Sequence, residues 1–456
     1  MARYVSVAVV FFIACVACVQ NVAWASEEEL MAEIKALKEK LAEMDQLKAR
    51  VAELEKQVGE QRCSILETEG TVKEVKEAMI QYKPGEGLEV KPYGLSVQAD
   101  ATFVVQGTPD ANNAGGKSKS RCDASWSSDI FIEKAFDDWG LALIHLEPGQ
   151  GDTVESELSL YSNVNRDANN TEGDVPITEL WYEQYLLNKQ LILTFGKLDP
   201  ANYLDQNEYA FDETTQFLGR IFRNSPVVEW PNDNTFGSTL TIAPEAIPYF
   251  AANASYFNAN NTWEDIFDKP FVSTQLTFML ARAFGLDEEK WNGNYRVYGW
   301  YNGLNHSKLV RTGEINPDNN EKRNFGFGFS FDQMLTDRAG VFARFGWQRG
   351  DINMAGTSPN TAPVEIGWSA GLELNGKTWN REDDVLAVAV GQVFPSEDYK
   401  DAGHGGKGEG HLEAYYRLQI TKWLALSPDY QLIWNPAGDE GTNPIFVYGT
   451  RGQIDF

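Results

Sequence analysis

The side chains that could do covalent or metal chemistry are few and scattered along this chain. The four histidines stand apart, and His404 and His411 flank a glycine-rich stretch as a chance pair would. We find no phosphate-binding loop, nucleophile elbow or cluster of zinc ligands. Cys63 and Cys122 are too distant to indicate a zinc site or a disulfide framework, although an oxidising compartment would allow them to pair. We therefore predict no catalytic residue, no metal site, no cofactor and no enzymatic activity.

Charged and aromatic residues occupy alternate positions of short segments. Arg296, Tyr298 and Trp300 share one parity, whereas Tyr295 and Val297 have the other. A dry core does not accept unpaired charges, but a water-filled channel does. Opposed charges orient polar solutes, and aromatic faces stack weakly on sugar rings, as conduction requires. By this parity the predicted wall residues are Arg296, Tyr298, Trp300, Arg344, Glu373, Glu413, Tyr415, Arg417, Arg451 and Asp455. The alternative for each is a solvated wall position without a role in selectivity.

One long stretch without alternation follows the strand that ends near Phe195-Gly196. It runs to Trp230-Pro231 and is rich in charged and amide residues. We interpret it as a loop that folds inward and narrows the channel, the alternative being an ordinary outer loop. The candidate constriction residues are Lys197, Asp199, Asn202, Asp205, Asp212, Glu213, Arg220, Arg223 and Trp230.

These residues require a scaffold of many short strands. Apolar and polar residues alternate with a period of two over 95–103, 272–280, 324–332 and 341–348. The mean hydropathy is −0.38 and aromatics make up 12% of the chain, which fits a barrel with a lipid-facing exterior and a wet interior. At roughly 23 residues per strand and connection, residues 93–456 predict an all-β transmembrane barrel of about 16 antiparallel strands.

The extreme N-terminus is typical of a secretory signal. Arg3 precedes an apolar stretch, and Ala23-Trp24-Ala25 is a small-x-small cleavage site, so residues 1–25 are predicted to be a signal peptide. A lipoprotein signal that uses Cys15 or Cys18 is the alternative.

The pattern of apolar residues over 26–83 predicts a long helix with an apolar heptad seam. The seam spacing alternates between three and four, with one stammer at Met44. We interpret the segment as a periplasmic coiled coil that forms a homo-oligomer. An amphipathic helix packed on its own barrel, or lying in the lumen, is the alternative. Residues 84–92 are expected to be a linker, because Pro84-Gly85-Glu86-Gly87 interrupts the helix.

The net charge of −27 argues against a nucleic acid as partner. Acidic loops at the barrel rim would explain this charge, and so would a pore that disfavours anions. The sequence leaves both explanations open.

Two stretches resemble the carbohydrate-selective porin family of the OprB type. Residues 177–219 contain FGKLD, NEYA and QFL elements similar to the midpoint of that family. Residues 413–456 contain EAYYRLQITKWLALSPDYQLIWNP and end in YGTRGQIDF, similar to the end of that family. A terminal aromatic such as Phe456 on an alternating strand is similar to the insertion signal of outer-membrane proteins.

This resemblance implies a 16-stranded barrel in the outer membrane and passive diffusion of small solutes, carbohydrates in particular. The expected partners are the lipid bilayer, the outer-membrane assembly machinery and polar solutes such as sugars. Two alternatives remain: a general, cation-preferring porin, and a mainly structural protein that tethers the outer membrane to the cell wall through its helix.

Overall fold

The computed structural model describes residues 27–111, 119–167, 170–231, 234–311, 321–353, 364–404 and 406–456. The side chains of residues 27–30, 45, 60, 63–79 and 92 are not among the described parts. The chain divides into two units, one up to Ala78 and one from Met79 to Phe456, and each is described by itself. The predicted signal peptide lies outside the described residues.

The first unit contains helix α2 (Glu27–Met79) of 53 residues. Alanine, leucine, glutamate and lysine dominate it, and these residues have high helix propensity. Its seam residues Leu37, Leu41 and Leu54 are exposed in the single chain. Within the described ranges, no helix is both long and apolar enough to cross a membrane. The helix ends at Met79, slightly before the predicted boundary at residue 83.

A hairpin follows the helix where a linker was expected. Strand β1 (Ile80–Lys83) pairs with β2 (Gly87–Val90), and β2 pairs with the start of the first long strand through Leu88 and Val97. Gly87 has φ +85°, and a Cβ there would overlap with the carbonyl of Val97. Glycine is therefore needed at this position. The segment that was predicted to interrupt the helix is the turn between β1 and β2.

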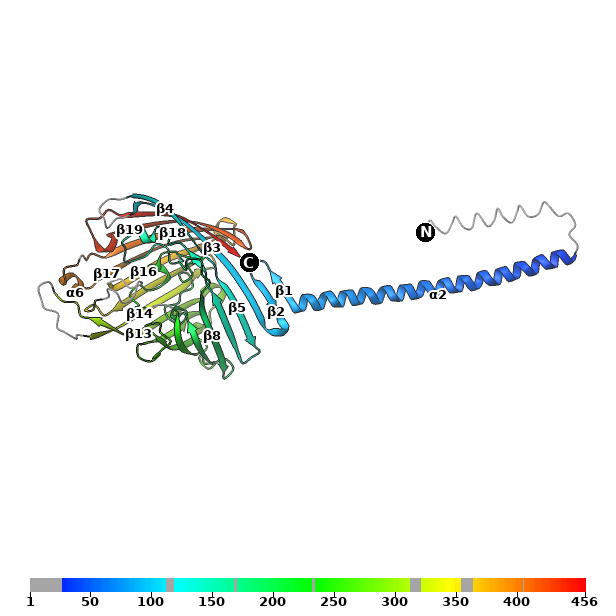
Figure 1. Ribbon diagram of the computed structural model, residues 1–456, viewed down its shortest axis with the longest axis horizontal. Coiled ribbons are helices and arrows are strands. Elements are labelled where there is room, and N and C mark those ends of the chain that lie inside the picture. Colours follow the sequence, from blue (N-terminus) through cyan, green and yellow to red (C-terminus); the bar gives the residue numbers. More distant parts are fainter. Residues whose placement is uncertain are drawn as a thin grey trace. The chain divides into compact units, whose positions relative to one another are not determined.

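The second unit is a closed, antiparallel barrel of 16 strands (Figure 1). Two of its strands are interrupted: β4 and β5 both pair with β3, and β7 continues β6. The barrel closes where β20 pairs with β3, from Tyr448 and Gly107 to Asp455 and Asp100. The strand bounds are β3 (Leu95–Ala111), β4 (Lys119–Ser127), β5 (Ile130–Phe136), β6 (Gly140–Leu146), β7 (Gly149–Gln150), β8 (Ile177–Leu186), β9 (Leu191–Leu198), β10 (Thr235–Ile242), β11 (Phe250–Asn258), β12 (Pro270–Met279), β13 (Gly293–Ser307), β14 (Glu321–Thr336), β15 (Ala339–Gln348), β16 (Val364–Asn375), β17 (Val385–Pro395), β18 (Glu409–Thr421), β19 (Leu424–Trp434) and β20 (Ile445–Asp455).

Short helices occupy several connections. The α-helical turns are α3 (Arg220–Arg223), α4 (Leu280–Phe284), α5 (Glu288–Trp291) and α6 (Glu397–Asp401), and the 3-10 turns are η1 (Lys91–Tyr93), η3 (Glu155–Glu157), η4 (Pro200–Tyr203), η5 (Gly376–Trp379) and η6 (Pro436–Gly438).

The alternation of residue types decides which side of each strand faces outward. Phe325 and Phe327 of β14 and Phe345 of β15 are exposed on the outer face. Ser330 of β14 lies opposite Arg344 of β15, and both are buried inside the barrel. Because a shift by one residue would exchange these two faces, the burial requirement specifies the register.

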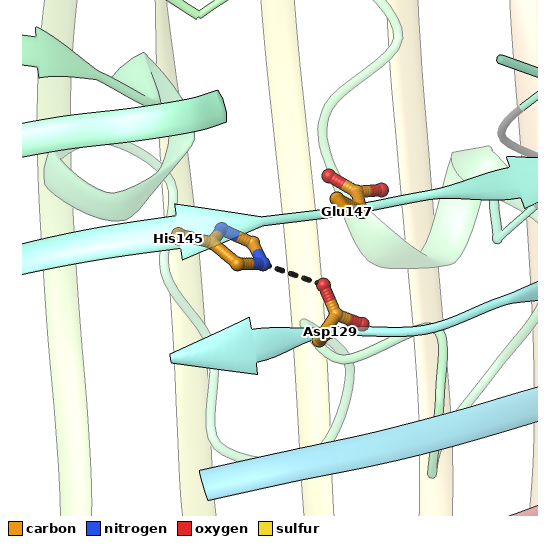
Figure 2. A group of neighbouring side chains, drawn as sticks. All are labelled: Asp129, His145 and Glu147. Carbon is orange, nitrogen blue, oxygen red and sulfur yellow. Dashed lines mark hydrogen bonds and ion pairs between the residues drawn. The ribbon is translucent and has the colours of Figure 1, made fainter. Parts of the chain in front are cut away.

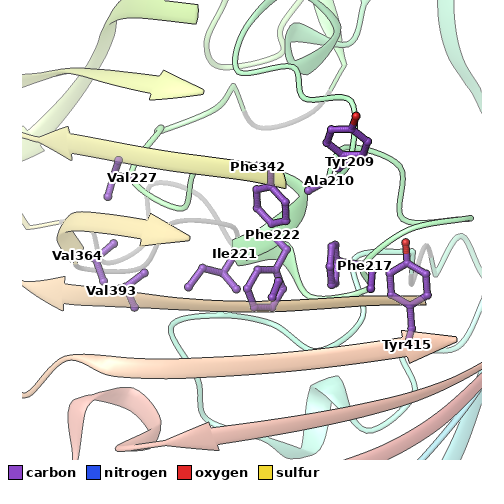
Figure 3. Packing of buried hydrophobic residues seen from close by; sticks show 12 residues of the cluster. Tyr209, Ala210, Phe217, Ile221, Phe222, Val227, Phe342, Val364, Val393 and Tyr415 are labelled. Atoms are coloured by element: carbon purple, nitrogen blue, oxygen red, sulfur yellow. The ribbon is translucent and has the colours of Figure 1, made fainter. Parts of the chain in front are cut away.

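Two connections fold into the barrel and pack against its inner wall. Segment A comprises residues 151–167, between β7 and β8, and segment B comprises residues 199–231, between β9 and β10. Segment B brings Phe217, Ile221 and Phe222 against Phe342 and Tyr415 of the wall, as Figure 3 shows. Part of the barrel interior is therefore an apolar core, where the sequence predicted only a wet lumen.

Candidate functional site

A buried ion pair anchors segment B to the wall. Arg344 on β15 reaches Asp205 of segment B, with Nε and Oδ1 3.2 Å apart. The same guanidinium donates to the backbone carbonyls of Asp205 and Phe222. The other carboxylate oxygen of Asp205 accepts a hydrogen bond from the backbone N–H of Ser225, 2.6 Å away. Arg344 thus binds segment B both at Asp205 and at Phe222, and the segment covers its side chain.

A second anchor of segment B lies on strand β18. Glu413 on β18 accepts hydrogen bonds from the backbone N–H groups of Leu218 and Gly219, at 2.6 and 2.8 Å. A Cβ at residue 219 would lie 2.7 Å from Oε2 of Glu413, so a larger residue there would displace this carboxylate. Arg451 on β20 donates to the carbonyls of Glu213 and Gln216.

Segment A is held in the same manner and joins segment B. Glu409 at the start of β18 accepts hydrogen bonds from the backbone N–H groups of Tyr161 and Ser162, at 2.8 and 2.6 Å. The backbone N–H of Arg166 donates to the carbonyl of Leu218 over 2.7 Å. The two segments therefore form one structure inside the barrel.

The helical turn α3 separates apolar side chains from basic ones. Ile221 and Phe222 face the wall at β16 and β17, whereas Arg220 and Arg223, three residues apart, lie on the other side of the turn. Both arginines line a cavity of about 150 Å³ together with Arg166 of segment A. The remaining lining residues are Asp199, Pro200, Ala201, Asn224, Trp230, Pro231 and Asn234.

Charges of both signs meet at this cavity, which we call the arginine pocket. Arg223 pairs with Glu213, with Nε and Oε2 2.6 Å apart, and lies 3.8 Å from the carboxylate of Asp199. Burial alone would lower the pKa of Arg223, but Glu213 and Asp199 outweigh it and raise that pKa. Burial, and then the neighbouring Arg166, lower the pKa of Arg220 to about 9. A guanidinium keeps its charge at neutral pH, so the pocket presents clustered positive charge.

An acidic patch on the wall belongs to the same region. Asp129 between β4 and β5 and Glu147 after β6 flank His145 of β6, as Figure 2 shows. Nε2 of His145 lies 2.6 Å from Asp129, and its Nδ1 lies 3.4 Å from Glu179 of β8. The backbone N–H of Asp199, which lines the arginine pocket, donates to Glu179 over 3.2 Å, so the acidic patch adjoins the pocket.

Asp129, His145 and Glu147 are also the described group whose ligand atoms come close enough to hold a metal ion. Both nitrogens of His145 already face carboxylates. We interpret the group as a polar network in which His145 bridges Asp129 and Glu179.

One aromatic side chain, Trp230, lines the arginine pocket and belongs to a larger aromatic stack. Trp230 stacks on Phe271 of β12, with ring centroids 6.4 Å apart, and Phe271 stacks in turn on Trp300 of β13 at 6.1 Å. Trp300 and Tyr298 are buried beneath segment B. Trp230 is the member of this stack that lines the cavity.

The structure brings together four of the predicted constriction residues, Asp199, Arg220, Arg223 and Trp230, and Glu213 joins them through Arg223. The others have different positions. Lys197 does not reach the pocket, because it shares the outward parity of Leu193 and Phe195 and donates to the carbonyl of Ile177. Asp205 is an anchor.

Asn202 and Asp212 have local roles in segment B. Asn202 is exposed, and its amide is 3.5 Å from Glu179. Asp212 accepts hydrogen bonds from Thr214 and Thr215, which close a turn. Neither of these two side chains lines the arginine pocket.

The predicted wall residues lie on the inner face, but most are covered. Arg344, Glu413, Tyr415 and Arg451 are buried beneath the two segments. Arg296 pairs with Asp332 of β14. Glu373, Arg417 and Asp455 are partly exposed. The sequence did not predict that segments A and B cover these residues.

Sequence reasoning missed Arg166 and the acidic patch. Residues 163–172 are polar and suggest an outer loop, yet the apolar Val154 and Val164 nearby are fully buried against Ile433, Ile445 and Val447. Such apolar residues within a polar connection are the signal that could have identified segment A.

The side chain of Cys63 is outside the described parts, and Cys122 is a free, exposed cysteine. The terminal Phe456 is about half exposed, and its backbone N–H donates to Ala99.

A closed barrel with an apolar outer face, a charged interior and inward-folded segments is the architecture of an outer-membrane porin. The chain matches the model of the OprB family, described as carbohydrate-selective porins, over residues 144–456. It therefore belongs to the OprB family, whose members are channels and not enzymes.

A solved OprB structure has the same fold. OprB of Pseudomonas putida at high pH aligns with a TM-score of 0.65 and 16% identity, over 80% of this chain and 94% of that chain. The outer-membrane channel DcaP of Acinetobacter baumannii aligns with a TM-score of 0.48 and 10% identity, over 81% of this chain and 99% of that chain. No curated protein sequence matches this chain.

Proposed function

We propose that this porin lets small carbohydrates diffuse passively across the outer membrane and that the arginine pocket is its selective constriction. The observation that supports this most is the combination in one cavity of Arg166, Arg220 and Arg223 with Asp199 and the ring of Trp230. Guanidinium groups donate hydrogen bonds to hydroxyl oxygens, and carboxylates accept them from hydroxyl groups. An aromatic face covers the apolar side of a sugar ring.

This chemistry favours weak and transient binding. The positive charges are partly neutralised by Glu213 and Asp199, so a polar but uncharged solute meets hydrogen-bond donors and acceptors in a reduced positive field. Conduction requires a site that a solute enters readily and also leaves readily. A neutral, hydroxyl-rich solute fits this condition better than a multivalent ion does.

A general, cation-preferring porin is the second candidate. The net charge of −27 and the acidic patch at Asp129, Glu147 and Glu179 favour it. The three arginines at the pocket oppose it, because they repel cations where the route is most confined. The reversal potential in a salt gradient separates the two candidates.

We also propose that the helical segment 26–83 lies in the periplasm and joins copies of the chain into an oligomer. Its exposed apolar stripe supports this assignment. Phe456, exposed at the end of β20, is proposed to be recognised by the outer-membrane assembly machinery. If the barrel conducted nothing and the helix bound peptidoglycan, the protein would instead be a structural tether.

Swelling of liposomes that contain the full chain tests the proposed function. We expect pentoses and hexoses to enter faster than a neutral, non-sugar solute of equal size, and the reversal potential to show weak ion selectivity. Equal rates for sugar and non-sugar, together with strong cation preference, would support the general porin instead. No swelling with any solute would favour the structural tether.

A further inference from the structure

Helix α2 exposes one narrow apolar stripe along its described part. In heptad notation, position a is taken by Ile34, Leu41, Val51 and Val58 and position d by Leu37, Met44, Leu47 and Leu54, with the stammer between Met44 and Leu47. These side chains are between 42% and 64% exposed in the single chain. A continuous exposed apolar stripe of this length indicates a surface that another molecule covers.

The charges beside the stripe identify what covers it. Position g of one heptad and position e of the next lie on opposite flanks of the stripe. They hold Glu33 and Lys38 in one such pair and Arg50 and Glu55 in another. In the sequence, positions 40 and 45 repeat the pattern with lysine and aspartate. When identical helices lie parallel and in register, each g residue meets the following e residue of its neighbour, so all three pairs have opposite charges.

Shifted arrangements lose this match. If one helix slid by one heptad, Arg50 would face Arg62 in one direction of the shift and Lys48 in the other. Both alternatives place like charges together, which is destabilising. The charges therefore favour the in-register pairing and disfavour a shift by one heptad in either direction.

We infer that α2 is the interaction surface for a second copy of this chain, and that the two helices pack parallel and in register from Ile34 to Val58. This inference rests on the proposed function, because barrels inserted in one membrane share one orientation and each helix is joined to its barrel at the C-terminal end. β-branched residues at most a positions, with leucine at most d positions, favour two strands.

Site-specific disulfide formation tests the inference in the full chain. In a background with Cys63→Ser and Cys122→Ser, Leu54→Cys places a thiol at a d position, where it meets its own copy in a parallel, in-register pair. Lys56→Cys, two residues away at the outer f position, is the matched control. We expect oxidation to link most of the Leu54→Cys protein into covalent dimers and to leave Lys56→Cys largely monomeric. Equal linkage of the two variants would overturn the inference.

Charge reversal supplies an independent arm. Arg50→Glu places like charges opposite Glu55 in both symmetry-related pairs, which we expect to weaken association about tenfold. Arg50→Glu combined with Glu55→Arg should restore it. Lack of restoration would contradict the register even if Leu54→Cys forms disulfides.

Native mass and conductance, measured on the same samples, separate the possible failures. An oligomer that persists without Leu54→Cys disulfides places the interface elsewhere and overturns the inference alone. A monomer overturns the self-association as well. A barrel that conducts no solute overturns the proposed porin function, whatever the helices do.

Discussion

Replacement of Arg344 by methionine should release segment B from the barrel wall. Arg344 and Asp205 form an ion pair whose side chains are only 2% and 0% exposed, and Arg344 also binds the carbonyl of Phe222. The substitution leaves the carboxylate of Asp205 buried without its cation. Loss of one partner from a buried pair costs about 3–5 kcal/mol, and each 1.4 kcal/mol changes an equilibrium about tenfold. The detached state of the segment should therefore become roughly 10² to 4 × 10³ times more populated.

Single-channel recording in planar bilayers measures this change. We expect Arg344→Met to show larger conductance and excess open-channel noise. The matched control is Arg338→Met, because Arg338 pairs with Asp337 at 4.0 Å and both side chains are 56% exposed. Exposed pairs of this kind contribute about 0–1 kcal/mol, so the control should conduct as the parent does. A folded Arg344→Met channel with unchanged conductance and noise would refute the proposed role of segment B as the constriction.

Two further predictions concern segment A. Glu409→Ala removes the acceptor of the backbone N–H groups of Tyr161 and Ser162. The free energy of local unfolding of segment A should therefore fall by about 2–4 kcal/mol, and a protease should cleave the segment faster. Glu397→Ala, at an exposed pair with Lys400, should not change the cleavage rate, and equal cleavage of both variants would contradict this anchor. Burial raises the pKa of Asp167 to about 8, well above its usual 3.9. The folded state therefore binds a proton that the unfolded state releases, and stability falls as the pH rises from about 4 to about 8. Asp167→Asn should raise the free energy of unfolding at pH 8 by up to about 5 kcal/mol and leave it unchanged below pH 4. The difference in melting temperature between the two proteins, measured across this pH range, checks this prediction.

The strand phases were predictable because burial rewards only one register. Tyr298 and Trp300 face inward and Val297 faces outward, as their alternation predicts. The inward course of segment B was also predictable, since a long connection without alternation cannot continue the wall. These features depend on local residue patterns.

The partners of the inward charges were not predictable. Arg344 and Asp205 are separated by 139 positions in the sequence, and neither position indicates the other by spacing. Arg166 reaches the pocket only because the backbone of segment A binds the carbonyl of Leu218. Lys197, which the sequence suggested as a constriction residue, lies away from the arginine pocket because the strand continues one residue further, with outward parity, before the chain turns inward at Asp199.

The hairpin after the helix shows a third kind of difference. The sequence predicted a helical segment up to residue 83, whereas the helix ends at Met79, and the pairing of β2 with β3 depends on a free edge. That edge exists because β20 stops at Asp455, opposite Asp100, and leaves Leu95–Val97 without a partner on that side. Such an opportunity arises only once the barrel is closed.

The interaction of sugars with the arginine pocket is tested most directly by sugar-induced block of the current through single channels. For Trp230→Ala we predict unchanged ion conductance and roughly 5- to 150-fold weaker block by a hexose or disaccharide, taking the about 1–3 kcal/mol of base stacking on an aromatic ring as the scale for a sugar ring. Trp263→Ala, at a tryptophan that is 59% exposed and outside the pocket, should leave the block unchanged. Equal block of the parent and both variants, or no block of the parent at any sugar concentration, would contradict the assignment of the arginine pocket as the carbohydrate-selective constriction.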